Sequence, residues 1–127
     1  MSFVRPVHWI VSMLGGEVLP LRFVGVDAGN QTRGHRFLAP DPIRVSGDLG
    51  EYIAALRKAF VIVDPQARRL LITAEIERIE EEVGCKVRRD EALVDEVTNL
   101  VEYPVGVCGQ FPDEYLEVPE QVIVSAM

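Results

Sequence analysis

The sequence has little cysteine, few aromatic residues and no long apolar run. Its two cysteines, Cys85 and Cys108, lie far apart and match neither metal-ligand spacing nor a disulfide framework. We therefore predict that both are small core residues and that the chain binds no metal. No segment approaches the roughly 18 apolar residues of a membrane-spanning helix. No secretory signal is recognisable at the N-terminus either, so a cytoplasmic location is expected.

Motifs for catalysis and phosphate binding are also missing. The sequence contains no GxGxxG, GxxxxGK[ST], HExxH or GxSxG, so none of the common phosphate loops, zinc sites or nucleophile elbows is recognisable. One conceivable pair of base and nucleophile is His35 with Cys108 or Ser12. Glu96 and Glu102 are a conceivable carboxylate pair. Nothing in the sequence brings either set together, and surface acids are the more common case.

The size and composition are those of one globular domain. A chain of 127 residues is long enough for one core and too short for two ordinary ones. The net charge of −7 argues against a general nucleic-acid binder, which usually has a basic surface. Residues 1–45 nevertheless contain five arginines against three acids. Any anionic partner is therefore expected to bind this N-terminal third.

A basic segment, residues 32–40, interrupts the acidic chain. It has the sequence Thr-Arg-Gly-His-Arg-Phe-Leu-Ala-Pro. In an extended segment the side chains alternate, so Arg33 and His35 would share one face and Arg36 would lie on the other. Gly34 between them allows another backbone or a phosphate to approach closely.

Two interpretations of the basic segment stay open. The functional interpretation is a contact with the phosphate, base or ribose of RNA. The structural interpretation is a strand whose arginines pair with some of the many acids and whose histidine is satisfied in a turn. The pattern alone favours the structural interpretation, because structural ion pairs often imitate sites. The candidate anion-binding residues are Arg33, His35 and Arg36, together with Arg5 and Arg44.

The N-terminal third is predicted to be β-rich. Alternating side chains indicate a strand over residues 7–14, expected in the interior of a sheet, and Gly15-Gly16 supplies a tight hairpin turn. A second β-rich stretch follows over residues 17–26, and residues 27–31 have turn composition. The aromatic residues Trp9 and Tyr103 are expected in the core rather than as base-stacking platforms.

The rest of the chain is predicted to be mainly helical, with short strands. Ser46 is the expected N-cap of a helix over about residues 48–59. Asp64-Pro65 begins the longest helix and Gly84 ends it. The stripe of this helix, Ile72, Ile76, Ile79 and Val83, is expected to pack on the sheet. The other expected elements are strands over residues 60–63, 85–87 and 100–107, a helix over residues 90–99, a helical turn over residues 113–118 and a last helix from residue 119.

These elements predict an α+β fold. A mostly antiparallel or mixed β-sheet would pack against about three helices, in a single domain over residues 1–127.

Four stretches, taken in order, resemble one known family. They are residues 3–10 (Phe-Val-Arg-Pro-Val-His-Trp-Ile), the basic segment, residues 95–104 (Asp-Glu-Val-Thr-Asn-Leu-Val-Glu-Tyr-Pro) and residues 111–127, with Val-Pro-Glu-Gln-Val-Ile. Together they closely resemble the N-terminal part of the β subunit of bacterial tetrameric glycyl-tRNA synthetase. The similarity covers essentially the whole chain, and the combination is specific although each stretch alone is weak.

The resemblance implies a class II aminoacyl-tRNA synthetase of two α and two β subunits. In that family the α subunit activates glycine with ATP and Mg²⁺, and the β subunit holds tRNA(Gly) and assembles the complex. The chain would be a domain excised from a longer β subunit, with the α subunit and the remaining β domains as partners. It would have no cofactor and no aminoacylation activity of its own. The implied role is tRNA contact; the alternatives are a scaffold for subunit assembly and a vestigial editing-like domain.

Overall fold

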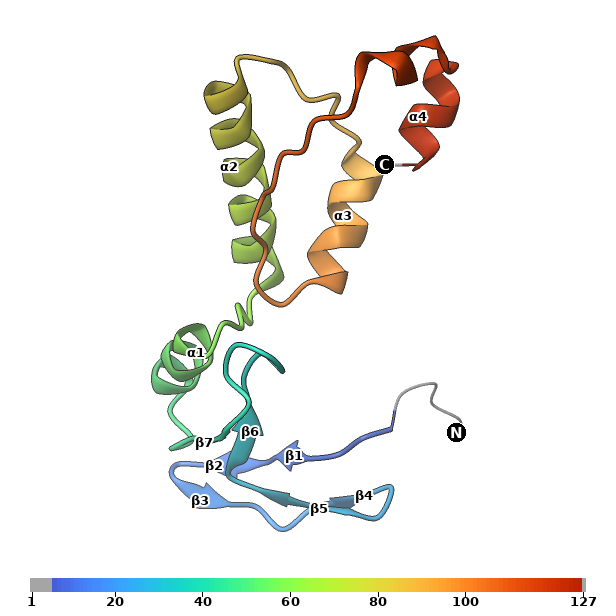
Figure 1. Cartoon of the computed structure of the whole chain (residues 1–127). Coiled ribbons are helices and arrows are strands. Elements are labelled where there is room, and N and C mark those ends of the chain that lie inside the picture. Colours follow the sequence, from blue (N-terminus) through green and yellow to red (C-terminus); the bar gives the residue numbers. More distant parts are fainter. Residues whose placement is uncertain (1–5, 127) are drawn as a thin grey trace.

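The structure, a computed structural model, describes residues 6–126. Within these residues the chain has four α-helices, one 3₁₀ helix and three small sheets, which confirms the predicted α+β class. Figure 1 shows three parts. We call residues 6–60, with all the strands and the first helix, the β lobe. Residues 65–106 form the helical lobe, and residues 107–126 form the C-terminal arm.

The β lobe contains short strands in three separate sheets. The predicted hairpin turn is confirmed, because Gly15 and Gly16 have φ of 60° and 110° and join β2 to β3. The order β1-β5-β4 places β1 at an edge, parallel to β5, and not in the interior as predicted. The expected turn over residues 27–31 is also wrong, since β5 continues through Gly29. The strands are β1 (Ile10–Val11), β2 (Met13–Leu14), β3 (Glu17–Val18), β4 (Arg22–Phe23), β5 (Val26–Gly29), β6 (Gln31–Arg33) and β7 (Pro42–Arg44).

Helix α1 (Leu49–Lys58) completes the β lobe. Its N-cap is Asp48 and not Ser46, because the Asp48 carboxylate accepts the Glu51 N–H at 2.8 Å. The Ser46 hydroxyl lies two residues too early for this bond and contacts the Glu51 carboxylate instead. The residues between α1 and the helical lobe form coil where a strand over residues 60–63 was predicted.

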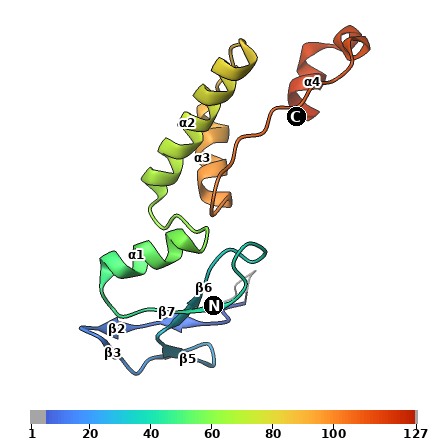
Figure 2. The same ribbon diagram turned by 60° about the vertical axis from the view of Figure 1, so that its left-hand side comes forward.

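Helix α2 (Pro65–Val83) has the predicted ends. The Asp64 carboxylate accepts the Gln66 N–H at 2.9 Å, and Gly84 closes the helix in the left-handed conformation at φ 71°. The predicted packing partner is wrong, because α2 packs against α3 (Glu91–Leu100) and not on a sheet. Both views show these two helices side by side, away from the strands (Figures 1 and 2).

The predicted strands over residues 85–87 and 100–107 do not form. Residues 101–106 instead return as coil along α2. The Glu75 carboxylate accepts the Gly106 N–H at 2.9 Å, and Arg78 donates to the Gly106 carbonyl at 3.0 Å. Side chains of α2 thus satisfy backbone groups for which the sequence suggested a neighbouring strand.

The predicted helical elements at the end of the chain are confirmed. The 3₁₀ helix η1 (Asp113–Glu117) and α4 (Glu120–Ala126) form the C-terminal arm. An ion pair between Arg88 and Glu120, at 2.7 Å, joins α4 to the loop before α3. None of the helices in the described part of the chain combines the length and hydropathy that a membrane span requires.

Residues 61–64, which we call the connection, lead from the β lobe to the helical lobe. Arg68 joins the helical lobe to this connection. Its Nε donates to the Thr98 carbonyl at 2.9 Å, which is one of the four carbonyls left over at the end of α3. Its Nη1 donates to the carbonyls of Ile62 and Val63, at 2.6 and 3.0 Å. The Ile62 N–H in turn donates to the backbone carbonyl of Glu102 at 2.9 Å, just beyond α3. One half-buried cation therefore fixes the connection against both helices.

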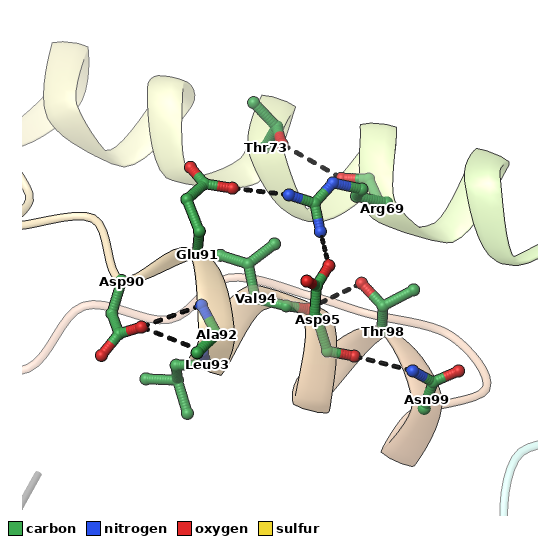
Figure 3. A network of polar contacts seen from close by, with 10 residues as sticks. All are labelled: Arg69, Thr73, Asp90, Glu91, Ala92, Leu93, Val94, Asp95, Thr98 and Asn99. Carbon is green, nitrogen blue, oxygen red and sulfur yellow. Dashed lines mark hydrogen bonds and ion pairs between the residues drawn. The ribbon is translucent and has the colours of Figure 1, made fainter.

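The next residue, Arg69, makes a different kind of contact between the same helices. Its guanidinium forms ion pairs with Glu91 and Asp95 on α3, as Figure 3 shows. The side chains of both acids are more than two-thirds exposed. Exposed ion pairs of this kind add little stability, because water already solvates both charges.

The buried core is small for a chain of this length. The core of the described residues consists of five buried hydrophobic residues, none of them fully buried, which cluster around α1, the connection and the first half of α2. The accessible surface is 10189 Å², whereas a compact monomer of this mass would expose about 6,800 Å². The open arrangement leaves many large apolar side chains in solvent. The core residues are Val45, Leu56, Ala59, Ile62 and Ile72.

Arg68→Met should lower the free energy of unfolding by about 3 kcal/mol, because three carbonyls lose a charged donor. Arg69→Met, the matched control one residue away, should cost less than about 1 kcal/mol. Urea unfolding measures both changes. Hydrogen exchange at the Ile62 amide should accelerate in the Arg68 variant only. Equal costs for the two variants would show that Arg68 is not the joint between the lobes.

A buried acid, Glu80, holds the loop between α2 and α3. Glu80 is 9% exposed, and its carboxylate accepts the Val87 N–H at 2.9 Å. Lys86 and Arg89 lie 3.4 and 3.5 Å from it. The hydrogen bond from Val87, helped by these two cations and opposed by burial, lowers the pKa of Glu80 below its ordinary 4.5.

The lowered pKa of Glu80 gives a prediction for acid unfolding. A carboxyl with a lower pKa in the folded state stabilises above the unfolded pKa, and this contribution is lost as the pH falls through the folded value. Thermal melts between pH 6 and 3 should therefore show a shallower acid decline for Glu80→Gln than for the parent chain. Glu81→Gln, at an exposed acid with no ion pair in residues 6–126, is the control and should keep the parent slope. Identical slopes for all three chains would contradict this role of Glu80.

Candidate functional site

A cleft of about 960 Å³ opens between the β lobe and the end of α3. We call it the basic cleft. Its wall comes from the segment before β1, from β6, from the stretch between β6 and β7 and from the start of β7, and one residue comes from the helical lobe. The lining residues are His8, Trp9, Gln31, Thr32, Arg33, Gly34, Arg36, Pro40, Pro42 and Glu102.

The pairing of β6 with β7 decides which side chains face this cleft. Thr32 lies opposite Ile43 and also lines the cleft, but at 8% exposure it is buried in the wall. Arg33 alternates with it and is exposed. Gln31 lies opposite Arg44, and directly opposed residues share one face of a sheet, so Arg44 lies beside the cleft wall.

The predicted alternation ends at Arg33, because the chain leaves the sheet and turns over residues 36–38. Gly34 is pressed against the end of α1: a Cβ there would lie 2.4 Å from the Ala59 Cβ. The predicted close approach of a backbone at Gly34 is therefore confirmed. The His35 N–H also donates to the Ala59 carbonyl at 2.8 Å. The turn brings Arg36 to the same cleft as Arg33, whereas simple alternation would have separated them.

The His35 side chain stabilises the turn over residues 36–38. Its Nδ1 accepts the N–H groups of Phe37 and Leu38, each at 3.3 Å. This is the arrangement that the structural interpretation described for the histidine. His35 is half-buried and does not line the basic cleft, so it shapes the segment that presents the arginines.

The arginines at the cleft differ from most other arginines of the chain. Arg33, Arg36 and Arg44 form no ion pair with any carboxylate in residues 6–126, so the pairing suggested by the structural interpretation is not seen there. Arg33 donates to the Pro40 carbonyl at 3.2 Å, and Arg36 lies 5.7 Å from the Phe37 ring centroid. The arginines that do form ion pairs are Arg22, Arg69, Arg78, Arg88 and Arg89.

Trp9 was predicted in the core, and this is wrong: it is 45% exposed and lines the cleft. Trp9 lies just before β1, so the alternation over residues 7–14 that suggested burial does not apply to it. The Arg33 guanidinium lies 5.9 Å from its ring centroid, and the His8 ring is stacked beside it at 6.3 Å. Tyr103 is half-buried against Phe60, in an edge-to-face contact at 5.4 Å.

The other candidates from the sequence fall in different places. Arg5 lies outside the described residues. Cys85 and Cys108 are exposed, so their predicted burial is wrong. Cys108 belongs to the C-terminal arm and His35 to the β lobe, and Figure 1 shows α4 of the arm at the end of the structure away from the strands. Within residues 6–126, no three His, Cys, Asp or Glu side chains form a cluster that could hold a metal ion.

Sequence reasoning missed four of the cleft residues: His8, Trp9 as an exposed ring, Gln31 and Glu102. The register of β6 against β7 could have suggested Gln31, since it precedes Arg33 by two positions. No signal in the sequence brings Glu102, about seventy residues further on, to the same cleft.

Comparison with known proteins gives a consistent result. The family model described as "Glycyl-tRNA synthetase beta subunit" matches residues 1–127. Curated relatives include the "Glycine--tRNA ligase beta subunit" of Anaeromyxobacter dehalogenans, 47% identical over 99% of this chain, and that of Syntrophus aciditrophicus, 44% identical over 98%. The same-named protein of Lactobacillus delbrueckii subsp. bulgaricus is 40% identical over 99% of the chain. This chain covers 18% of the length of each of these relatives.

Proposed function

This chain belongs to the glycyl-tRNA synthetase beta subunit family, and we propose that it contributes a tRNA-contacting, non-catalytic surface to glycine–tRNA ligase. The basic cleft is that surface. Arg33 and Arg36 bind phosphate within the cleft, and Arg44 extends the basic wall along β7. His35 orients the turn and does not bind RNA directly.

The proposal rests on the arginines at the cleft, which have no carboxylate partner in residues 6–126. In a chain of net charge −7, five of the ten arginines in residues 6–126 pair with carboxylates, and Arg33, Arg36 and Arg44 are among the five that do not. A guanidinium that pairs with no carboxylate keeps its net positive charge for a phosphate. Two of these cations line one cleft beside an exposed aromatic ring, which is the pattern of a surface that binds single strands of nucleic acid.

The acidic balance of the rest of the chain supports local rather than general binding. Among the residues that line the cleft, Glu102 is the single acid. The acids of α2 and α3 lie in the helical lobe, where Arg69 and Arg78 neutralise several of them. RNA would therefore meet a favourable potential at the cleft and an unfavourable one over the helices.

The proposed setting is the assembled enzyme in the cytoplasm. We propose tRNA(Gly), the α subunit and the other parts of the β subunit as partners, with activation of glycine by ATP and Mg²⁺ assigned to the α subunit. On this proposal the chain needs no cofactor of its own.

A scaffold role is the second candidate, and the open shape favours it. The surface exceeds that of a compact chain of the same mass by about 3,400 Å². Large apolar side chains in the C-terminal arm stay exposed, among them Val107 at 87% and Leu116 at 66%. Patches of this kind usually mark contacts with other protein surfaces. These side chains lie away from the basic cleft, so packing there is compatible with RNA binding at the β lobe.

Arg33→Gln combined with Arg36→Gln, in the assembled ligase that carries this chain, should weaken tRNA binding at least about tenfold, because phosphate contacts are lost. The slope of log affinity against log salt should become shallower by about 1.4 to 1.8, at roughly 0.7 to 0.9 for each contact. Glycine activation without tRNA should not change. Binding measured over a salt series gives both the affinity and the slope.

The matched control is Arg22→Gln combined with Arg88→Gln. Both residues are exposed arginines outside the cleft, so this variant removes the same charge and should keep the parent salt slope. If the Arg33 and Arg36 variant binds tRNA normally but loses stability or its α subunit, the scaffold role is the better account.

A further inference from the structure

We propose that Trp9 is a stacking platform for an unpaired base, so that the basic cleft holds a single-stranded nucleotide of the RNA rather than the side of a duplex. This inference rests on the proposed function and adds the class of RNA element that is recognised. The platform is built from Trp9, with Arg33 and Arg36 for phosphate and Glu102 from the helical lobe.

The surroundings of Trp9 suit a platform better than a core position. Its ring is nearly half exposed although it is the largest apolar side chain type, and it is the chain's single tryptophan. The His8 ring stacks beside it with an angle of 26° between the planes, which extends the flat surface. The Arg33 guanidinium lies 5.9 Å from the indole centroid, at the outer limit of a cation–π contact. A base that stacks on the indole would be close to this cation as well.

The charges in the cleft determine the orientation of a bound nucleotide. The phosphate is attracted by Arg33 and Arg36, which line one wall. Glu102 comes from the helical lobe, repels phosphate, and can accept hydrogen bonds from ribose hydroxyls or from a base amino group. The phosphate therefore faces the arginines, and the sugar or base edge faces Glu102.

The wall with the arginines is held in place before any ligand arrives. Arg33 donates to the Pro40 carbonyl, and Gly34 is fixed against the end of α1 by its contact with Ala59. The His35 ring caps the turn that carries Arg36. A site that is already ordered loses less entropy on binding. Trp9 itself lies directly before β1, which β5 holds in the sheet.

A duplex cannot use such a platform, because its base faces are already stacked on their neighbours. Only unpaired bases of loops, bulges and ends offer a free face to an aromatic side chain. The cleft volume of about 960 Å³ lies within the roughly 300 to 1,000 Å³ range of sites that enclose small ligands. It therefore suits one or two nucleotides and not the width of a helix.

The test compares Trp9→Ala, Trp9→Phe and the control Tyr115→Ala in the assembled ligase that carries this chain. Tyr115 is 52% exposed in the C-terminal arm, so its replacement removes a comparable ring away from the cleft. Each protein is titrated with tRNA, with a short unpaired oligoribonucleotide and with a blunt RNA duplex of the same charge. Thermal melts and gel filtration of each variant report folding and subunit assembly.

Trp9→Ala should weaken binding of tRNA and of the unpaired oligoribonucleotide about tenfold or more, as expected for the loss of one stacked base. Its salt slope should stay at the parent value because no phosphate contact is lost. Trp9→Phe should recover most of the affinity, and Tyr115→Ala should change nothing. Duplex binding should be weak and equal in all variants.

Two results would overturn the inference, and they are distinct from failure of the proposed function. In the first, Trp9→Ala keeps the parent affinity for tRNA while the Arg33 and Arg36 variant binds tRNA weakly. That result would show that the cleft binds phosphate and that Trp9 is not a stacking platform. A loss of melting temperature or of subunit assembly in Trp9→Ala, with RNA affinity per folded protein unchanged, would show that Trp9 seats another protein segment. If neither the arginine nor the tryptophan variants affect tRNA binding, the proposed function itself fails.

Discussion

The hydrogen bonds of Arg68 are the contact on which the arrangement of this chain depends. The two lobes share few buried side chains, so burial alone does not fix their relation. A single guanidinium satisfies backbone carbonyls at the end of α3 and in the connection from the β lobe. The bond from Ile62 to the carbonyl of Glu102 lies beside these contacts. The position of Glu102 at the basic cleft therefore follows from a contact that is itself remote from any ligand.

Local sequence signals identified the helices well. One or two residues are enough to start or end a helix. Asp64 with Pro65 and Asp90 begin helices and Gly84 ends one, and each acts on backbone groups within a few positions. The shift of the first N-cap from Ser46 to Asp48 shows the usual limit, because both side chains can cap and only the exact turn decides between them. Gly15 and Gly16 likewise determine their hairpin through positive φ.

The sequence was a poor guide wherever a distant partner decides the structure. An apolar stretch over residues 100–107 could be a strand, but α2 supplies Glu75 and Arg78 to its backbone and it stays coil. Trp9 follows an alternating pattern, yet the strand begins after it and the ring stays exposed. The arginine candidates were recognisable from composition alone. Their meeting in one cleft depends on the turn at Gly34 and His35, which alternation could not predict.

We propose that RNA occupies the basic cleft, and photo-crosslinking would locate the bound RNA on the protein. tRNA(Gly) substituted with 4-thiouridine would be irradiated in complex with the assembled ligase that carries this chain, and the modified peptides would be mapped by mass spectrometry. We expect crosslinks at Trp9 and within residues 31–36, and we expect them to disappear under excess unlabelled tRNA. Crosslinks confined to the helical lobe or the C-terminal arm, with none at the cleft, would contradict it.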